Sequence, residues 1–334
     1  MARMTRFAPP HVCANLALIA VAALAAGWLL VGLPLALRAS PWSAEFVWLA
    51  IAPVVLTTPI HWGLIHEGIH GQLLPSRRAN ERVARALAIA LALPFEAVRF
   101  GHLMHHRYTR EPYDRPDVVE PTQSRWRTAV TYYARLLGGL YVGELLVPLV
   151  AFVPASASAA IVARGVGAHG PVGAQVQRLF ARQAADPERR RRTRRDWLLS
   201  LALYAFALHL YGPWWPVLVV SMYLRGLWLS VADNLPHYGV ALDEPGRARD
   251  FRVPRGVGLL LMNHHLHRQH HLRPTLPWMA LAREGDAAPP LARPGYLRAA
   301  LHQFRGVRPD DPASQSCVSA SPMRGSASAE TKRG

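Results

Sequence analysis

Long uncharged apolar runs alternate with short polar stretches over most of the chain. The first run, residues 13–37, holds 25 residues without a charged side chain. At a rise of about 1.5 Å per helical residue, this run is long enough to cross a bilayer. Arg3 and Arg6 precede it as they would precede a signal peptide, but the run is too long for a signal-peptide core and no clear cleavage site follows. The pattern predicts a retained transmembrane helix.

Three further runs bring the prediction to about four transmembrane helices: Phe46 to about Ile65, and the two halves of a hairpin, Trp197–Tyr211 and Val217–Val231. Pro53 and Pro59 are expected to kink the second span. The run 86–95 is only about ten residues long and too short to cross a bilayer, which predicts a re-entrant or interfacial helix.

The apolar stretch 136–162 is interrupted by Glu144, Pro148 and Pro154. If it crossed the membrane once, the arginine-rich segment 189–195 would lie outside, against the rule that positive loops stay in the cytoplasm. We therefore predict a shallow hairpin or an in-plane segment here.

Composition supports a membrane protein. Of the 334 residues, 51% are hydrophobic and 18% are charged, and the formal net charge is +17. So basic a chain could bind nucleic acid or an anionic membrane surface, and the long apolar runs favour the membrane. The two cysteines, Cys13 and Cys317, lie far apart, which excludes a disulfide framework and an iron–sulfur centre built by this chain alone.

Nine of the sixteen histidines fall into four short groups: His66 and His70; His102, His105 and His106; His237; and His267, His270 and His271. Residues three and four apart share one face of a helix, so the imidazoles of each group point together. Nine nitrogen ligands are too many for one metal, which takes about six at most, and suit two metals with four or five each. Imidazole alone does not distinguish iron from zinc, copper or nickel.

A single pair of histidines on a membrane helix is often only structural. Here the alternative of hydrogen-bonded structural histidines is disfavoured, because two His-x-x-His-His groups and the other elements fall on the same predicted side of the membrane. His61 is expected to be a hydrogen-bonded residue between helices. His264 and His265 flank the last group and are candidates for supporting it.

The four groups resemble the histidine boxes of the membrane fatty acid desaturase and hydroxylase superfamily. The resemblance covers His66 to Pro277 and includes the segments that follow the boxes. Asp114-Arg115-Pro116-Asp117 is similar to the family's Asp-Pro-Asp-like turn, and the run from His270 through Pro274 to Pro277 is similar to its His-His-Leu-x-Pro-x-x-Pro ending.

The resemblance implies a pair of irons, held by His66, His70, His102, His105, His106, His237, His267, His270 and His271. Asn234 matches, with imperfect spacing, a family asparagine that holds a metal-bound water. Glu67, Asp114 and Asp117 are candidate carboxylates that accept the free ring N–H of a ligand histidine and orient it; a solvated turn is the alternative for the two aspartates.

The resemblance also implies O2 as co-substrate and a lipid chain in the membrane as substrate, most simply a fatty acyl chain that is desaturated. Electrons are expected from an external ferredoxin, rubredoxin-like protein or reductase, because the chain shows no haem-binding motif and too few cysteines. The segment 189–195 is predicted mainly as a positive-inside anchor, with docking of an acidic donor or anionic lipid as the alternative.

Three other functions stay open. Leu235-Pro236-His237 is also similar to carotenoid ring ketolases and hydroxylases, and His237-Tyr238-Gly239 to alkane-type monooxygenases. A metal-binding membrane protein without catalysis is the non-enzyme alternative.

The expected architecture is an all-α integral membrane protein with a cytoplasmic cap that carries the histidine boxes. Residues 1–305 are predicted to form one desaturase-like domain, and 306–334 a disordered polar tail. The composition points to a bacterial inner membrane, with the boxes facing the cytoplasm.

Overall fold

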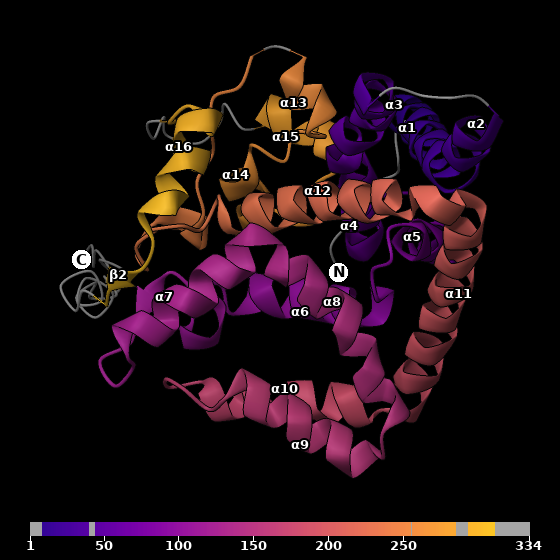
Figure 1. Ribbon diagram of the computed structural model, residues 1–334. Helices are drawn as coiled ribbons and strands as arrows, with labels where there is room; N and C mark the ends of the chain where they lie inside the picture. The colour runs from indigo at the N-terminus through magenta and orange to yellow at the C-terminus, as the bar shows by residue number, and fades with distance from the viewer. Residues whose placement is uncertain (1–8, 40–43, 255, 285–292, 311–334) are drawn as a thin grey trace, which may run out of the picture.

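The computed structural model describes residues 9–39, 44–254, 256–284 and 293–310, and most of them are helical (Figure 1). The N-terminal half contains α1 Pro9–Gly27, α2 Leu33–Ala39, α3 Ala44–Leu56, α4 Thr58–His70, α5 Arg77–Ala90, α6 Phe95–Arg107, α7 Arg125–Ala134, α8 Leu140–Leu146 and α9 Ala155–Val166. The C-terminal half contains α10 Gly173–Ala185, α11 Pro187–Tyr211, α12 Trp215–Asn234, α13 Val257–Leu260, α14 His267–Leu272, α15 Trp278–Glu284 and α16 Tyr296–His302.

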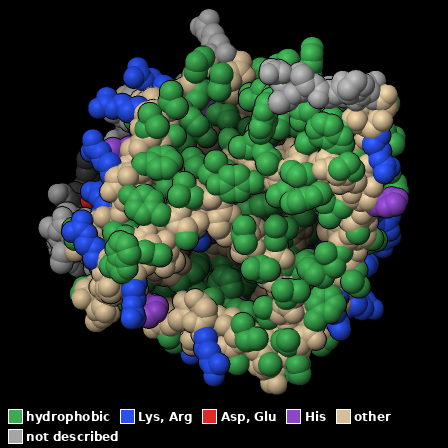
Figure 2. Space-filling view, in the orientation of Figure 1, with side chains coloured by type: hydrophobic (Ala, Val, Ile, Leu, Met, Phe, Trp, Pro, Cys, Tyr) green, Lys and Arg blue, Asp and Glu red, His purple; other side chains and the backbone are tan. Residues whose placement is uncertain are grey.

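Four helical runs are long and apolar enough to cross a membrane: His11–Ala39, Phe46–His70, Arg125–Phe152 and Pro187–Asn234. The chain is therefore an all-α membrane protein, as its apolar pattern predicts. Large apolar side chains on these runs point outward, including Leu24 at 74% exposure and Leu49 at 67%. Figure 2 shows one face of the molecule that is almost entirely apolar, with arginines gathered at its edges. Such a surface suits contact with lipid.

The first two runs coincide with the first two predicted spans. A π-helical segment, Trp28–Gly32, joins α1 to α2 without interrupting the helix. The second run is broken at Thr57, between α3 and α4, and Pro59 occupies the first turn of α4. A proline there loses no intrahelical hydrogen bond, so the chain bends without an unsatisfied N–H group.

The two halves of the predicted hairpin correspond to α11 and α12, both longer than the predicted apolar runs, but the two helices meet at a corner and are not folded back antiparallel (Figure 1). A short 3-10 turn, Gly212–Trp214, joins the two helices at a corner (Figure 1). Gly212 has φ +53°, a backbone conformation that favours glycine. The first two turns of α11 carry the arginines of 189–195, so the helix extends well beyond its apolar part.

The stretch 136–162 does not fold back on itself as the predicted shallow hairpin; the alternative, an in-plane segment, stays a prediction. Its first part belongs to the helical run Arg125–Phe152, which Leu137 and Gly138 kink by leaving helical φ/ψ values. A 3-10 segment, Val147–Phe152, ends this run. After Pro154 the chain enters α9, which packs against α10 and not against α8 (Figure 1). The hairpin is therefore formed by α9 and α10, one helix later than the apolar pattern suggests.

The short run 86–95 is not a separate helix. Its first residues close α5, which ends at Ala90, and Phe95 begins α6. Leu87, Ala88, Leu91, Leu93 and Phe95 of this run are buried at the α5–α6 corner. The run is therefore divided between two helices: α5 ends at Ala90, Ala92 has a φ of +55°, and Pro94 directly precedes the first residue of α6. That this corner lies at the membrane interface stays a prediction.

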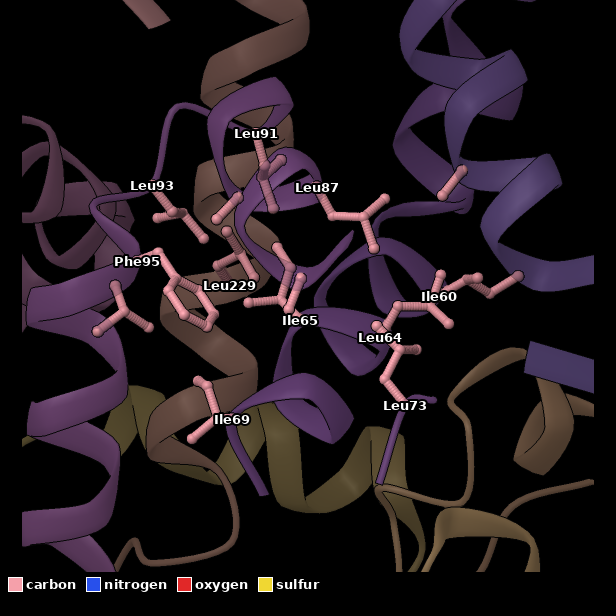
Figure 3. Packing of buried hydrophobic residues seen from close by; sticks show 14 of the residues in the cluster. Ile60, Leu64, Ile65, Ile69, Leu73, Leu87, Leu91, Leu93, Phe95 and Leu229 are labelled. Atoms are coloured by element: carbon pink, nitrogen blue, oxygen red, sulfur yellow. The ribbon is translucent and has the colours of Figure 1, made fainter. Parts of the chain in front are cut away.

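One apolar core holds α4, α5 and the start of α6 together. Leu64, Ile65, Leu91 and Phe95 meet in it with almost no exposed surface (Figure 3). A Cβ atom at Gly68 would lie 2.2 Å from the Cβ of Ala84, so only glycine allows α5 to approach α4 this closely. The histidine-bearing turn of α4 is fixed by this packing.

A buried ion cluster fixes the other side of α5. The Arg85 guanidinium contacts Glu96 of α6 at 2.5 Å, Glu81 at 2.9 Å and also Asp196 of α11. A buried cation with several carboxylate partners is costly to break, because each partner would be left uncompensated. The cluster therefore ties α5, α6 and α11 to one another.

The C-terminal part of the described chain returns to the loop after α6. β1 Val118–Val119 pairs in parallel with β2 Arg308–Pro309, Val118 opposite Arg308. Residues 306–310 thus belong to the folded part, beyond the predicted domain boundary at 305. The rest of the predicted tail, 311–334, lies outside the described residues.

Candidate metal centre

Four segments distant in sequence bring the nine predicted histidines together. His66 and His70 lie one turn apart on α4, and the second group lies at the end of α6. His237 lies in the turn after α12, and the last group is carried by α14. α14 has six residues, and the Asp250 carboxylate accepts hydrogen bonds from the backbone N–H groups of Arg268 (2.9 Å) and Gln269 (3.4 Å) near its start.

The side chains divide into two clusters, in each of which the candidate ligand atoms lie within 4.8 Å of one another. The five-histidine cluster contains His66, His70, His102, His106 and His270. The four-histidine cluster contains His105, His237, His267 and His271. Both His-x-x-His-His boxes contribute to both clusters, so the two clusters are neighbours; the rings of His106 and His271 stack at 4.3 Å.

The contacts within the four-histidine cluster form a closed ring of Nε2 atoms. His105 lies 3.1 Å from His237 and 3.2 Å from His271, and His267 lies 3.1 Å from each of the same two. A neutral imidazole nitrogen either donates one hydrogen or accepts one. At most two of these four contacts can therefore be hydrogen bonds, so hydrogen bonding among the imidazoles does not account for all four short distances.

A metal ion in each cluster would resolve this conflict. In the five-histidine cluster, Nε2 of His102 lies 2.8 Å from that of His70 and 3.0 Å from that of His106. Two nitrogens bound at about 2.1 Å and at right angles would be about 3.0 Å apart. Nε2 of His66 is buried without a hydrogen-bond partner among the described residues, as a ligand atom would be before its metal binds. The donor set and spacing fit metal binding.

Three of the imidazoles use their second nitrogen to fix their orientation. Nδ1 of His105 contacts the Asp114 carboxylate at 2.8 Å, and Nδ1 of His237 donates to the Arg247 carbonyl at 2.9 Å. Nδ1 of His271 lies 3.4 Å from the Thr109 hydroxyl, which itself donates to the His105 carbonyl. Such partners hold a ring in the tautomer that presents Nε2 to a metal.

The other predicted supporting residues contact groups that are not imidazoles. Asp117 is fully buried, pairs with Arg110 and accepts the Gly239 N–H at 2.8 Å, so it joins the loops that carry the second box and His237. Glu67 accepts the Trp278 N–H at 3.2 Å.

Asn234 does not point its amide nitrogen at a cluster. It donates to Gln303 at 2.6 Å and to the Tyr132 hydroxyl at 3.2 Å. Sequence reasoning missed Thr109, Asp250 and the Arg247 carbonyl, since none of them belongs to a histidine motif. His264, a predicted supporting residue, lies beside the clusters: its ring centroid is 5.0 Å from that of His66 and 4.5 Å from that of His267.

Burial sets the protonation of the site. Burial and then neighbouring imidazoles lower the pKa of His102, His267, His270 and His271 well below the usual range. These rings are therefore neutral at pH 7, as metal ligands must be. Burial also lowers the pKa of His105, but the Asp114 carboxylate more than reverses this effect, and the pKa lies above its ordinary value.

A cavity of about 330 Å³ begins at the clusters, where His102, His105 and His237 line it. Its apolar wall includes Trp62, Leu93, Val98 and Leu229; its polar wall includes Arg135, Glu144 and Asp233. A second cavity of about 300 Å³ lies between α8, α9, α10 and α11 and shares Gly101, Glu144, Gly165, Val166 and Phe180 with the first. Together the two cavities lead from the histidines toward the start of α11.

Comparison with protein families agrees with this geometry. The family model described as "Fatty acid desaturase" matches residues 40–299, which include every box histidine. The chain belongs to the fatty acid desaturase family, whose members oxidise fatty acyl chains, and it is an oxidoreductase of the membrane. Comparison with curated proteins finds no match.

Replacing Asp114 by Asn is expected to weaken metal binding about 10- to 100-fold, because the His105 ring loses the anion that orients it and makes it a stronger ligand. Titration of the purified protein with Co²⁺, followed by absorption, measures the change. The matched control is Asp243→Asn, which alters a carboxylate with no histidine contact among the described residues. Equal affinity of the two variants would show that Asp114 does not support a metal ligand.

Proposed function

We propose that this protein oxidises an unactivated C–H bond of a fatty acyl chain, most simply to desaturate it, with two irons held by the nine histidines. The observation that carries the proposal is the cavity that starts at His102, His105 and His237 and continues along an apolar wall. Bound iron would supply O2-dependent oxidation that no side chain can perform. An acyl chain in this cavity would have one carbon beside the clusters.

The residues of the chain have three tasks in this proposal. The apolar side chains of Trp62, Leu93, Val98 and Leu229 exclude water from the substrate and hold it by contact. The buried, neutral imidazoles present their Nε2 lone pairs. Asp114, Thr109 and the Arg247 carbonyl keep the rings in place while the substrate enters and leaves.

Electrons come from an external redox partner in this proposal, as the family implies in general terms. The chain has two cysteines, Cys13 and Cys317, and so cannot assemble a thiolate-bound iron–sulfur cluster of its own, which takes about four. A ferredoxin, a rubredoxin-like protein or a reductase would deliver them.

Iron content tests the proposed ligands. The wild-type protein is expected to bind about two irons per chain after anaerobic loading, because nine ligands overfill one site. His270→Ala and His271→Ala change adjacent residues that belong to different clusters, so each should lower the content to about one. His302→Ala alters an exposed histidine outside both clusters and is the control. One iron or less in the wild-type protein would contradict the two-metal assignment.

Product analysis tests the reaction. Expression in a host with saturated lipids, supplied with carotenoid, is expected to yield acyl chains with a new double bond. Gly101→Leu should abolish the product while keeping the iron, since Gly101 lines both cavities and its side of the helix is open. Gly143→Leu, at an equally open glycine that lines neither cavity, is the matched control.

Other outcomes of this experiment would replace the proposal. Unchanged acyl chains with oxygenated carotenoid rings would favour a ring ketolase or hydroxylase. Hydroxylated chains without double bonds would favour a monooxygenase. Iron binding without any O2 consumption would leave a non-catalytic metal-binding protein.

We also propose that the box-bearing segments face the cytoplasm. His105 and His237 lie 3.1 Å apart, so the chain between them crosses the membrane an even number of times. α11 and α12 account for two crossings, which leaves Arg125–Phe152 without a complete one despite its length. The arginines at the start of α11 then stay inside, as positive loops do.

Reporter fusions test this topology. Fusions after Arg78 and after Gly239 are expected to report the cytoplasm, and a fusion between α2 and α3 should report the opposite side. A fusion after Phe152 should also report the cytoplasm, since the run before it does not cross completely. Opposite sides for Arg78 and Gly239 would contradict the proposal.

A further inference from the structure

Besides Asp114, three charged side chains line the cavity of about 330 Å³, which we call the inner cavity; the cavity of about 300 Å³ is the outer cavity. Arg135 of the kinked segment pairs with Asp233 of α12 at 2.9 Å, and Glu144 of α8 lies close enough to interact electrostatically with both. Ionisable residues within membrane segments are costly, and where they face a cavity they usually mark a substrate or ion pathway.

Glu144 differs from the other two in having no bonded partner. Asp233 already forms the ion pair with Arg135. Among the described residues no N–H or O–H group donates a hydrogen bond to the Glu144 carboxylate, which is half-buried. Glu144 lines both cavities, so it stands where the inner cavity meets the outer one.

Binding of an unsubstituted hydrocarbon chain beside the Glu144 carboxylate would be unfavourable. Methylene groups passing Glu144 would displace water from the carboxylate and return no hydrogen bond, and an unpaired polar group in an apolar contact is destabilising. A substrate that carries a hydrogen-bond donor at this point would remove the conflict.

We propose that Glu144 accepts a hydrogen bond from a hydroxyl group on the substrate, and that it thereby selects hydroxylated acyl chains and fixes their position relative to the histidine clusters. This inference rests on the proposed acyl oxidation and adds the class of acyl chain. The hydroxyl lies between the carbon beside His102 and His105 and the part of the chain in the outer cavity.

The charges around the cavity favour a neutral hydroxyl over a cationic donor. Arg135 lies beside Glu144, and Arg189 and Arg190 line the outer cavity. An ammonium group would have to pass these guanidinium groups to reach the carboxylate. A hydroxyl carries no charge and needs only the one acceptor that Glu144 provides.

The probes are stearoyl chains with a single hydroxyl moved carbon by carbon, compared with unsubstituted stearoyl chains. The wild-type protein is expected to show one best hydroxyl position, with kcat/KM about tenfold above the unsubstituted chain, as for one added hydrogen bond. Glu144→Leu, of similar size, should bring this ratio close to one. Glu144→Gln keeps an acceptor oxygen and should retain part of the preference.

Leu146→Met is the matched control, because Leu146 lies on the same helix, faces outward and lines neither cavity. It should keep the wild-type ratio. If Glu144 only balances the charge of Arg135, its variants lower activity on every chain equally and the ratio is unchanged, which overturns the inference. Equal wild-type activity on all hydroxyl positions and on the plain chain overturns it as well.

The two proposals fail in different ways. Oxidation of plain chains without discrimination leaves the acyl oxidation standing and removes the role of Glu144. A wild-type protein that is loaded with iron, supplied with electrons and still inactive on every acyl chain contradicts the acyl oxidation itself, and the hydroxyl inference falls with it.

Discussion

The convergence of nine imidazole Nε2 atoms is the constraint on which the rest of the structure depends. Hydrogen bonds cannot satisfy the closed ring formed by His105, His237, His267 and His271. Holding such a set together requires that the helices that carry the histidines be rigidly placed. The close contact of Gly68 with Ala84 fixes α4, and the Arg85 ion cluster fixes α6. The Asp250 carboxylate fixes the start of α14. The scaffold thus holds the nine imidazoles close together, as metal binding would require.

The candidate ligands could be predicted because their chemistry is local. Histidines three and four apart on a helix must share a face, and counting nine of them was enough to indicate two sites. The division between the sites was not predictable, because adjacent residues such as His105 and His106 belong to different clusters. It depends on how α6 and α14 are rotated against each other, and that rotation is set by long-range packing.

The supporting contacts and the irregular helices were harder to predict for the same reason. Asp114 could be predicted because it follows His105 by nine residues. Asp250, which accepts a hydrogen bond at the start of α14, is held there by an antiparallel bridge to Leu266, and no sequence motif indicates this bridge. The spans at 11–39 and 46–70 follow from hydropathy alone. Hydropathy does not specify Leu137 and Gly138, where the backbone leaves the helix, so the path of 136–162 needed tertiary information.

The same helix carries both candidate metal ligands and part of the cavity wall. On α6, Val98 and Gly101 line the cavity, and His102 and His105 end it one turn later. Because these residues share one helix, the distance along it from the wall residues to His102 and His105 is fixed. In the proposed function, a substrate that packs against α6 would therefore lie at a set distance from the histidines. Glu144 faces this wall from α8, which lies on a different, kinked segment. The distance between the two walls therefore depends on the kink at Gly138. In the proposed function, this irregular segment sets where an acyl chain lies relative to the histidines.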